Sequence, residues 1–241
     1  MNETNLKIIN MSDVESKEIS WLWYPFIPYG KLTIIQGDPG EGKTTLVLNI
    51  AAVLSKGQGL DEHMNPEQPL HIIYQTAEDG LKEKAKLMIL DPIQAYLGAK
   101  MDMNRANEAR DMTKHLGQVA ERTGCAIVLI GHMNKNAGGK VAYRGMGSID
   151  FFAVARSVLL VGRVKGQENR RAMIQIKNNL AERGHAKSFV LTDGVFTWKG
   201  DYDITEDELA GGFAPKTSKQ EEAKDLLVSL SCTTKEAAVS Q

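Results

Sequence analysis

The chain has 241 residues, of which 42% are apolar and 24% charged, as expected for an ordinary globular protein. No apolar run approaches the roughly 18 residues of a membrane span, the N-terminus lacks the apolar core of a signal peptide, and two cysteines are too few for a disulfide framework. These features exclude an integral membrane protein and favour the cytoplasm. The net charge of −1 hides a basic block, because residues 131–190 contain eleven Lys or Arg and only three acids.

The first half of the chain predicts strands that alternate with helices. Apolar runs predict buried strands at 31–36, 70–77 and 85–92, and apolar residues at helical spacing predict helices at 43–57 and 104–123. This alternation is typical of βαβ units around a parallel sheet.

The second half predicts more strands and a polar tail. We expect strands at 125–132, 154–162 and 171–179, and a hairpin over 189–198 that turns at Asp193–Gly194. Beyond these strands, Ser218 and Glu221 form a capping box that predicts one more helix. We therefore divide the chain into an N-terminal extension (1–18), a core (19–200) and a linker with a short helical tail (201–241).

The stretch "GDPGEGKTT" directly follows the first predicted strand and opens the first predicted helix. It matches the phosphate-loop pattern G-x-x-x-x-G-K-[ST] in the context that this pattern requires. Its glycines let the backbone approach a phosphate, and the helix N-terminus adds positive potential. We expect these residues to bind nucleotide phosphates: Gly37, Asp38, Pro39, Gly40, Glu41, Gly42, Lys43, Thr44 and Thr45. Lys43 would reach the β- and γ-phosphates, and Thr44 would ligate Mg²⁺.

Two acidic positions follow later strands and could complete a hydrolytic site. Asp91 ends the run "LMILDP", where a Walker B aspartate that holds Mg²⁺ is expected. Glu78 comes just after "IIYQT", and a carboxylate there could act as the base for an attacking water. The alternative for both is an acid that merely follows a strand in a loop.

Five motifs in order resemble the RecA-like AAA family ATPases of plasmids, phages and integrated elements. They are "WLWYPFIPYGKLTIIQGDPGEGKTT", "IIYQTAED", "LDPIQAYLG", "VLIGHMNK" and "YRGMGSIDFFAVARSVLLVGR", and together they extend over roughly residues 18–199. The best-understood members are hexameric replicative helicases of the RepA type. The resemblance implies a three-layer α/β, RecA-like P-loop NTPase domain with a mostly parallel central sheet and a late β-hairpin.

The resemblance also implies roles for particular residues. Glu78 would activate water, Asp91 would be the Walker B aspartate, and His132 would be the sensor of the γ-phosphate. Lys177 would reach the γ-phosphate of a neighbouring subunit, with Arg170 and Arg171 as alternatives. For His132 the other interpretation is a strand-end histidine that bonds to a neighbour.

The resemblance implies partners as well: ATP and Mg²⁺, single-stranded DNA, further copies in a ring of about six, and a primase or replication initiator. The Gly-rich segment after the fourth strand would face the DNA in the ring channel. Lys135, Lys140 and Arg144 would contact phosphates, and Tyr143 could stack on a base. The alternative is a surface loop with incidental lysines, just as the basic block could be a solvated surface.

The chain departs from the family pattern between the strands that precede Glu78 and Asp91. Only about ten residues connect these strands, whereas a parallel crossover generally needs a dozen or more. We expect either an extended return or a rearranged sheet. The tail is also shorter than the winged-helix module of many relatives, which is consistent with a truncated module.

These observations leave three functions open. The first is a RecA-like, helicase-type ATPase that acts on single-stranded DNA in the replication of a mobile element. The second is a nucleotide-binding switch or relic without turnover, caused by the shortened segment. The third is a small-molecule phosphotransferase, although the stretch 56–71 carries no basic clamp for an acceptor.

Overall fold

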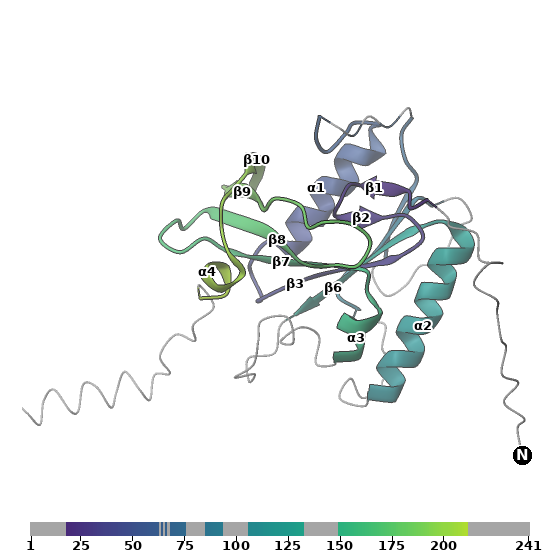
Figure 1. Ribbon diagram of the computed structural model, residues 1–241. Helices are drawn as coiled ribbons and strands as arrows, with labels where there is room; N and C mark the ends of the chain where they lie inside the picture. Colours follow the sequence, from purple (N-terminus) through teal and green to yellow (C-terminus); the bar gives the residue numbers. More distant parts are fainter. Residues whose placement is uncertain are drawn as a thin grey trace, which may run out of the picture.

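The structure, a computed structural model, describes residues 18–75 except 63, 65 and 67, then 85–93, 106–132 and 149–211. Figure 1 shows a central sheet with helices on both of its faces. No helix in these ranges is long and apolar enough to cross a membrane. The helices are α1 (Lys43–Ser55), α2 (Ala106–Thr123), α3 (Ile149–Val154) and α4 (Glu206–Gly211).

The central sheet has eight strands and is parallel over more than half of its width. In spatial order the strands are β4 (Ile72–Gln75), β5 (Leu87–Leu90), β6 (Ala126–His132), β3 (Leu32–Gly37), β7 (Ser157–Arg163), β8 (Arg170–Asn178), β9 (Lys187–Thr192) and β10 (Val195–Asp201). The strands from β4 to β7 in this order are parallel, and β8, β9 and β10 are each antiparallel to the strand before them. The carboxyl ends of the parallel strands therefore lie at one edge, where open α/β sheets bind their ligands.

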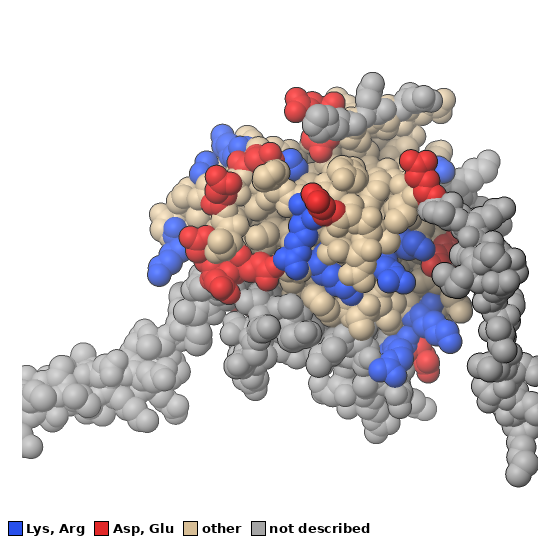
Figure 2. Space-filling model, viewed as in Figure 1, with Lys and Arg blue, Asp and Glu red and all other residues tan. Residues whose placement is uncertain are grey.

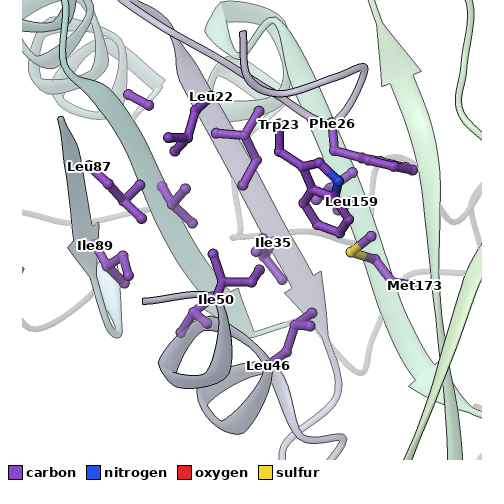
Figure 3. Packing of buried hydrophobic residues seen from close by; sticks show 14 of the residues in the cluster. Leu22, Trp23, Phe26, Ile35, Leu46, Ile50, Leu87, Ile89, Leu159 and Met173 are labelled. Atoms are coloured by element: carbon purple, nitrogen blue, oxygen red, sulfur yellow. The ribbon is translucent and has the colours of Figure 1, made fainter. Parts of the chain in front are cut away.

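Alternation along β3 gives the domain its three layers. Ile35 packs in one hydrophobic cluster with Leu46 and Ile50 of α1 (Figure 3), whereas Ile34 packs in the other cluster with Val119 of α2. Successive side chains on a strand point to opposite faces, so β3 is covered on both. Each such buried aliphatic side chain stabilises the fold by roughly 1.5–3 kcal/mol.

The fold class predicted from the sequence, a three-layer α/β domain with a mostly parallel sheet and a late β-hairpin, is confirmed. The hairpin turns where it was predicted: Asp193 has φ 50° and Gly194 has φ 77°, as a two-residue turn with left-handed positions requires. β4 and β5 are adjacent and parallel, with Ile72 opposite Leu87. The short connection between them therefore does not rearrange this part of the sheet, although residues 76–84 themselves lie outside the described residues.

Three short features were not predicted from the sequence. β1 (Trp21–Trp23) and β2 (Ile27–Pro28) form a small separate hairpin, too short to give an alternating pattern. The helix α3 occupies residues 149–154, so the strand expected from residue 154 begins at Ser157 instead. α4 lies in the stretch assigned to the linker, and its Leu209 is fully buried against the core. The helix expected after Ser218 lies outside the described residues.

Candidate functional site

The phosphate loop connects β3 to α1 at the carboxyl edge of the sheet. Gly37 is the last residue of β3, and a Cβ there would lie 2.1 Å from the carbonyl oxygen of Val161, so no other residue fits. Gly40 and Gly42 have φ values of 81° and 84°, a backbone conformation that favours glycine. Gly42 is also the N-cap of α1, and no side chain caps this helix. The first amides of α1 are thus arranged to bind an anion.

Lys43 is folded into this loop. It is 4% exposed, and its Nζ donates hydrogen bonds to the carbonyl oxygens of Gly37 (2.9 Å) and Asp38 (2.8 Å). Burial lowers the pKa of Lys43 below its ordinary value, although the charges of Asp38 and Asp91 act in the opposite direction. The amine is therefore held inside the loop by acceptors that a bound phosphate could replace.

Asp91 and Thr44, the two residues predicted to ligate Mg²⁺, meet at the mouth of the loop. Thr44 Oγ1 donates a 2.7 Å hydrogen bond to Asp91 Oδ2. Adjacent ligands of an octahedral Mg²⁺ with bonds of about 2.1 Å lie roughly 3 Å apart, so this pair fits the ion together with phosphate oxygens. Two strands that are not neighbours, β3 and β5, bring the pair together across β6.

Tyr74 also contacts Asp91, and this contact was not predicted. Its hydroxyl donates a 2.8 Å hydrogen bond to the same oxygen, Asp91 Oδ2. Tyr74 lies in β4, one strand beyond β5, and faces Asp91 from the side. A tyrosine near the end of the strand before an acidic position is the only sequence signal for it, and that signal is weak.

His132 ends β6 and is directly opposite Gly37 in the register of β3 and β6. Desolvation and the charge of Lys43 lower the pKa of His132, and Asp91 and Asp38 act against this shift. The imidazole is thus close enough to the loop to interact with its charges. This location agrees with the role expected of a γ-phosphate sensor.

Lys177 and Arg170, two of the three residues considered for a trans-acting finger, are engaged within their own chain. Lys177 Nζ donates hydrogen bonds to the carbonyl oxygens of Phe152 (2.6 Å) and Ala153 (3.1 Å) at the end of α3. Burial and the nearby Arg156 lower its pKa. The guanidinium of Arg170 lies 5.2 Å from the ring centre of Tyr202.

Two arginines lie beside the phosphate loop, and their contact with it was not predicted. Arg171, considered above as a finger, is 8% exposed, and its Nε lies 3.9 Å from the position of a Cβ at Gly42. Arg163 is its cross-strand partner in β7, and Arg163 Nε lies 4.0 Å from Oε2 of the loop residue Glu41. The sequence signal is a basic residue at the end of "VLLVGR", the strand that follows the glycine-rich segment.

Several predicted site residues lie outside the described part of the chain. They are Glu78, Lys135, Lys140, Tyr143 and Arg144. Their roles stay predictions.

Comparisons of the sequence find a matching family model and several similar proteins. A family model described as "AAA domain" matches residues 3–85 and 80–138, more than half of the chain. The DNA repair protein RadA of Streptococcus pneumoniae is 24% identical over 151 residues, which is 53% of this chain and 36% of that protein. RadA of Aquifex aeolicus is 24% identical over 193 residues, which is 68% of this chain and 40% of that protein. The chain thus spans well under half the length of these relatives.

Two solved structures resemble the chain in part. A crystal structure of the RadB recombinase aligns with a TM-score of 0.48 and 12% identity, over 70% of this chain and 90% of that one. A KaiC-like protein from Pyrococcus horikoshii OT3 aligns with a TM-score of 0.49 and 16% identity, over 71% of this chain and 90% of that one.

Proposed function

Since the chain belongs to the AAA domain family, we propose that it binds ATP with Mg²⁺ at the loop of residues 37–45 and hydrolyses the ATP. The observation that carries this proposal is the contact between Thr44 and Asp91, which joins the phosphate loop to an acid from a separate strand. A glycine turn of purely structural use would not need this pair. It is the arrangement by which P-loop ATPases hold a magnesium nucleotide.

Each residue of the site has a defined task in this proposal. The amides at the start of α1 and the Nζ of Lys43 bind the phosphates, and Thr44 and Asp91 hold the ion. Mg²⁺ held by these two residues would supply positive charge next to the phosphates. Glu78 orients and deprotonates the attacking water. β4 ends at Gln75 beside β5, so the chain leaves β4 at the edge of the sheet where Asp91 lies.

We further propose that hydrolysis is coupled to single-stranded DNA in a ring of several copies, as in a helicase-type motor of a mobile element. The segment with Lys135, Lys140, Tyr143 and Arg144 follows β6 directly after His132 and would contact the DNA. A support for DNA as the partner is that the curated relatives are named as DNA repair proteins.

The charge of the basic block is partly compensated within the protein. Three of its residues form ion pairs with acids from outside the block: Arg163 with Glu41, Arg183 with Glu206, and Lys187 with Asp201. Figure 2 shows Lys and Arg interspersed with Asp and Glu on the visible face. The proposal therefore assigns DNA binding to the glycine-rich segment rather than to the whole block.

The first experiment is steady-state ATP hydrolysis by the full chain, with and without a poly-dT oligonucleotide at low salt. We expect several-fold stimulation by the oligonucleotide and loss of nucleotide binding in Lys43→Ala. Lys56→Ala is the matched control, because it removes the same charge from the exposed far end of α1. Binding without turnover would favour the switch instead, in which the short connection between β4 and β5 has cost the chain its catalytic base. No binding by the wild type would overturn both functions.

A further inference from the structure

We propose that Arg163 and Arg171, which lie beside the phosphate loop on β7 and β8, hold this loop in position. They draw the side chain of Glu41 away from the phosphate-binding face and neutralise its charge. This inference rests on the proposed nucleotide binding and adds two positioning residues to that site. It concerns a contact within one chain. It assigns Arg171 to its own phosphate loop instead of to that of a neighbouring subunit.

The need for such residues comes from the loop itself. Glu41 immediately precedes Gly42, in the turn that wraps the phosphates. Its charge acts on the pKa of Lys43, so the carboxylate is within electrostatic reach of the lysine that is proposed to bind phosphate. An uncompensated carboxylate so close to Lys43 would repel the phosphates of a nucleotide.

The two arginines are placed to compensate this charge. Arg163 and Arg171 face each other across β7 and β8, at the edge where the loop leaves the sheet. The loop packs against neighbouring strands at both of its ends. A Cβ at Gly37 would meet the backbone of Val161 in β7, and one at Gly42 would meet Leu191 of β9 at 2.7 Å and lie 3.9 Å from Arg171 Nε. Burial and the charge of Arg163 lower the pKa of Arg171, and the charge of Glu41 acts in the opposite direction.

Hydrogen bonding indicates that the contact between these charges is incomplete. Arg171 Nη1 donates to the carbonyl oxygen of Glu168 at 3.2 Å, which fixes the guanidinium. Its Nε is buried without a hydrogen-bond partner among the described residues, and so is Oε2 of Glu41. The distance of 4.0 Å from Arg163 Nε to this oxygen is too long for a hydrogen bond. A closer approach of Glu41 to the arginines would give these buried atoms partners.

The test measures the affinity for ADP and for a non-hydrolysable ATP analogue in three variants of the full chain. In Arg163→Gln the charge of Glu41 is left under-compensated, and we expect nucleotide to bind about tenfold more weakly. Arg163 is half-exposed, so this variant should fold. Glu41→Gln keeps the shape of the side chain but removes its charge, so it is the reference for the double variant. In the double variant the repulsion is gone, and we expect affinity within about threefold of that of Glu41→Gln.

A second readout separates repulsion from a general structural defect. Salt screens charge repulsion, so the ratio of the Arg163→Gln and wild-type dissociation constants should fall as ionic strength rises. Arg183→Gln is the matched control, because it removes an arginine from a surface ion pair with Glu206 away from the loop, and it should bind like the wild type. Arg171→Met should repeat the Arg163→Gln result and should also be rescued by Glu41→Gln.

The outcomes are distinct. If the double variant binds as weakly as Arg163→Gln, or if Arg163→Gln binds like the wild type, the inference is overturned while nucleotide binding stands. If the wild type itself binds no nucleotide, the proposed function fails and this inference fails with it.

Discussion

At the scale of single residues, the oxygen Asp91 Oδ2 is the best-defined point of the site, because two donors from different elements, α1 and β4, converge on it. Thr44 lies in the first turn of α1 and is expected to exchange its hydrogen bond for Mg²⁺ when nucleotide binds. Tyr74 comes from β4 and can keep its bond throughout. We therefore regard Tyr74 as the group that orients the carboxylate.

Tyr74→Phe removes this donor and leaves the ring in place. We expect the Mg²⁺ concentration for half-maximal ATP binding to rise about three- to tenfold, in line with the loss of one hydrogen bond worth about 0.5–1.5 kcal/mol. ADP binding without Mg²⁺, measured in the same titration series, should not change. Tyr202→Phe removes a hydroxyl that accepts a bond from Gln167 at the surface and should leave both quantities unaltered. An unchanged Mg²⁺ dependence in Tyr74→Phe would show that Thr44 alone fixes Asp91.

The sequence predicts the residues of this site whose type and spacing are dictated by chemistry. Gly37, Lys43 and Thr44 have fixed offsets in one loop, and Asp91 has a fixed place at a strand end. Tyr74 and Arg163 follow no such offset. Their contacts depend on the order of the strands and on which face each side chain occupies, and only the structure provides these.

At the scale of elements, the same reasoning explains which helices and strands were predicted. The strands of the parallel core are long apolar runs, and the hairpin carries Asp193–Gly194 at its turn, so both give clear patterns. α4 is six residues long and mostly polar, and only its capping box marks it. Thr205 Oγ1 accepts from the amide of Glu208 (3.3 Å), and Glu208 Oε2 accepts from the amide of Thr205 (2.8 Å).

Thr205→Ala tests whether this capping box holds α4 on the core. Loss of an N-cap costs about 1 kcal/mol, and α4 carries the buried Leu209, so we expect the free energy of unfolding to fall by about that amount. Urea unfolding would show a lower midpoint with an unchanged slope. Thr192→Ala, at an exposed strand end, is the matched control and should have little effect. A midpoint equal to that of the wild type would mean that burial of Leu209 alone keeps α4 in place.

At the scale of the whole molecule, the carboxyl edge of the sheet gathers the features proposed for function. The phosphate loop, Asp91, His132 and Arg163 lie at the ends of the parallel strands or directly after them, and Arg171 lies opposite Arg163 near the start of β8. The segment expected to contact DNA continues from the same edge, directly after β6. His132, at the end of β6, would thus connect the phosphate site to the segment expected to contact DNA.

The last prediction concerns how DNA binding depends on salt. Each phosphate contact to single-stranded DNA contributes about −0.7 to the slope of log Kobs against log salt concentration. If Lys135 and Lys140 each contact a phosphate, the slope for Lys135→Ala/Lys140→Ala should be less steep than that of the wild type by about 1.4, measured with labelled poly-dT. Lys165→Ala/Lys187→Ala removes two lysines from the same basic block, and its slope should equal that of the wild type because Lys187 already pairs with Asp201. The reverse result, a change only in the second variant, would move the DNA-binding surface to β7–β9 and away from the strand end that carries His132.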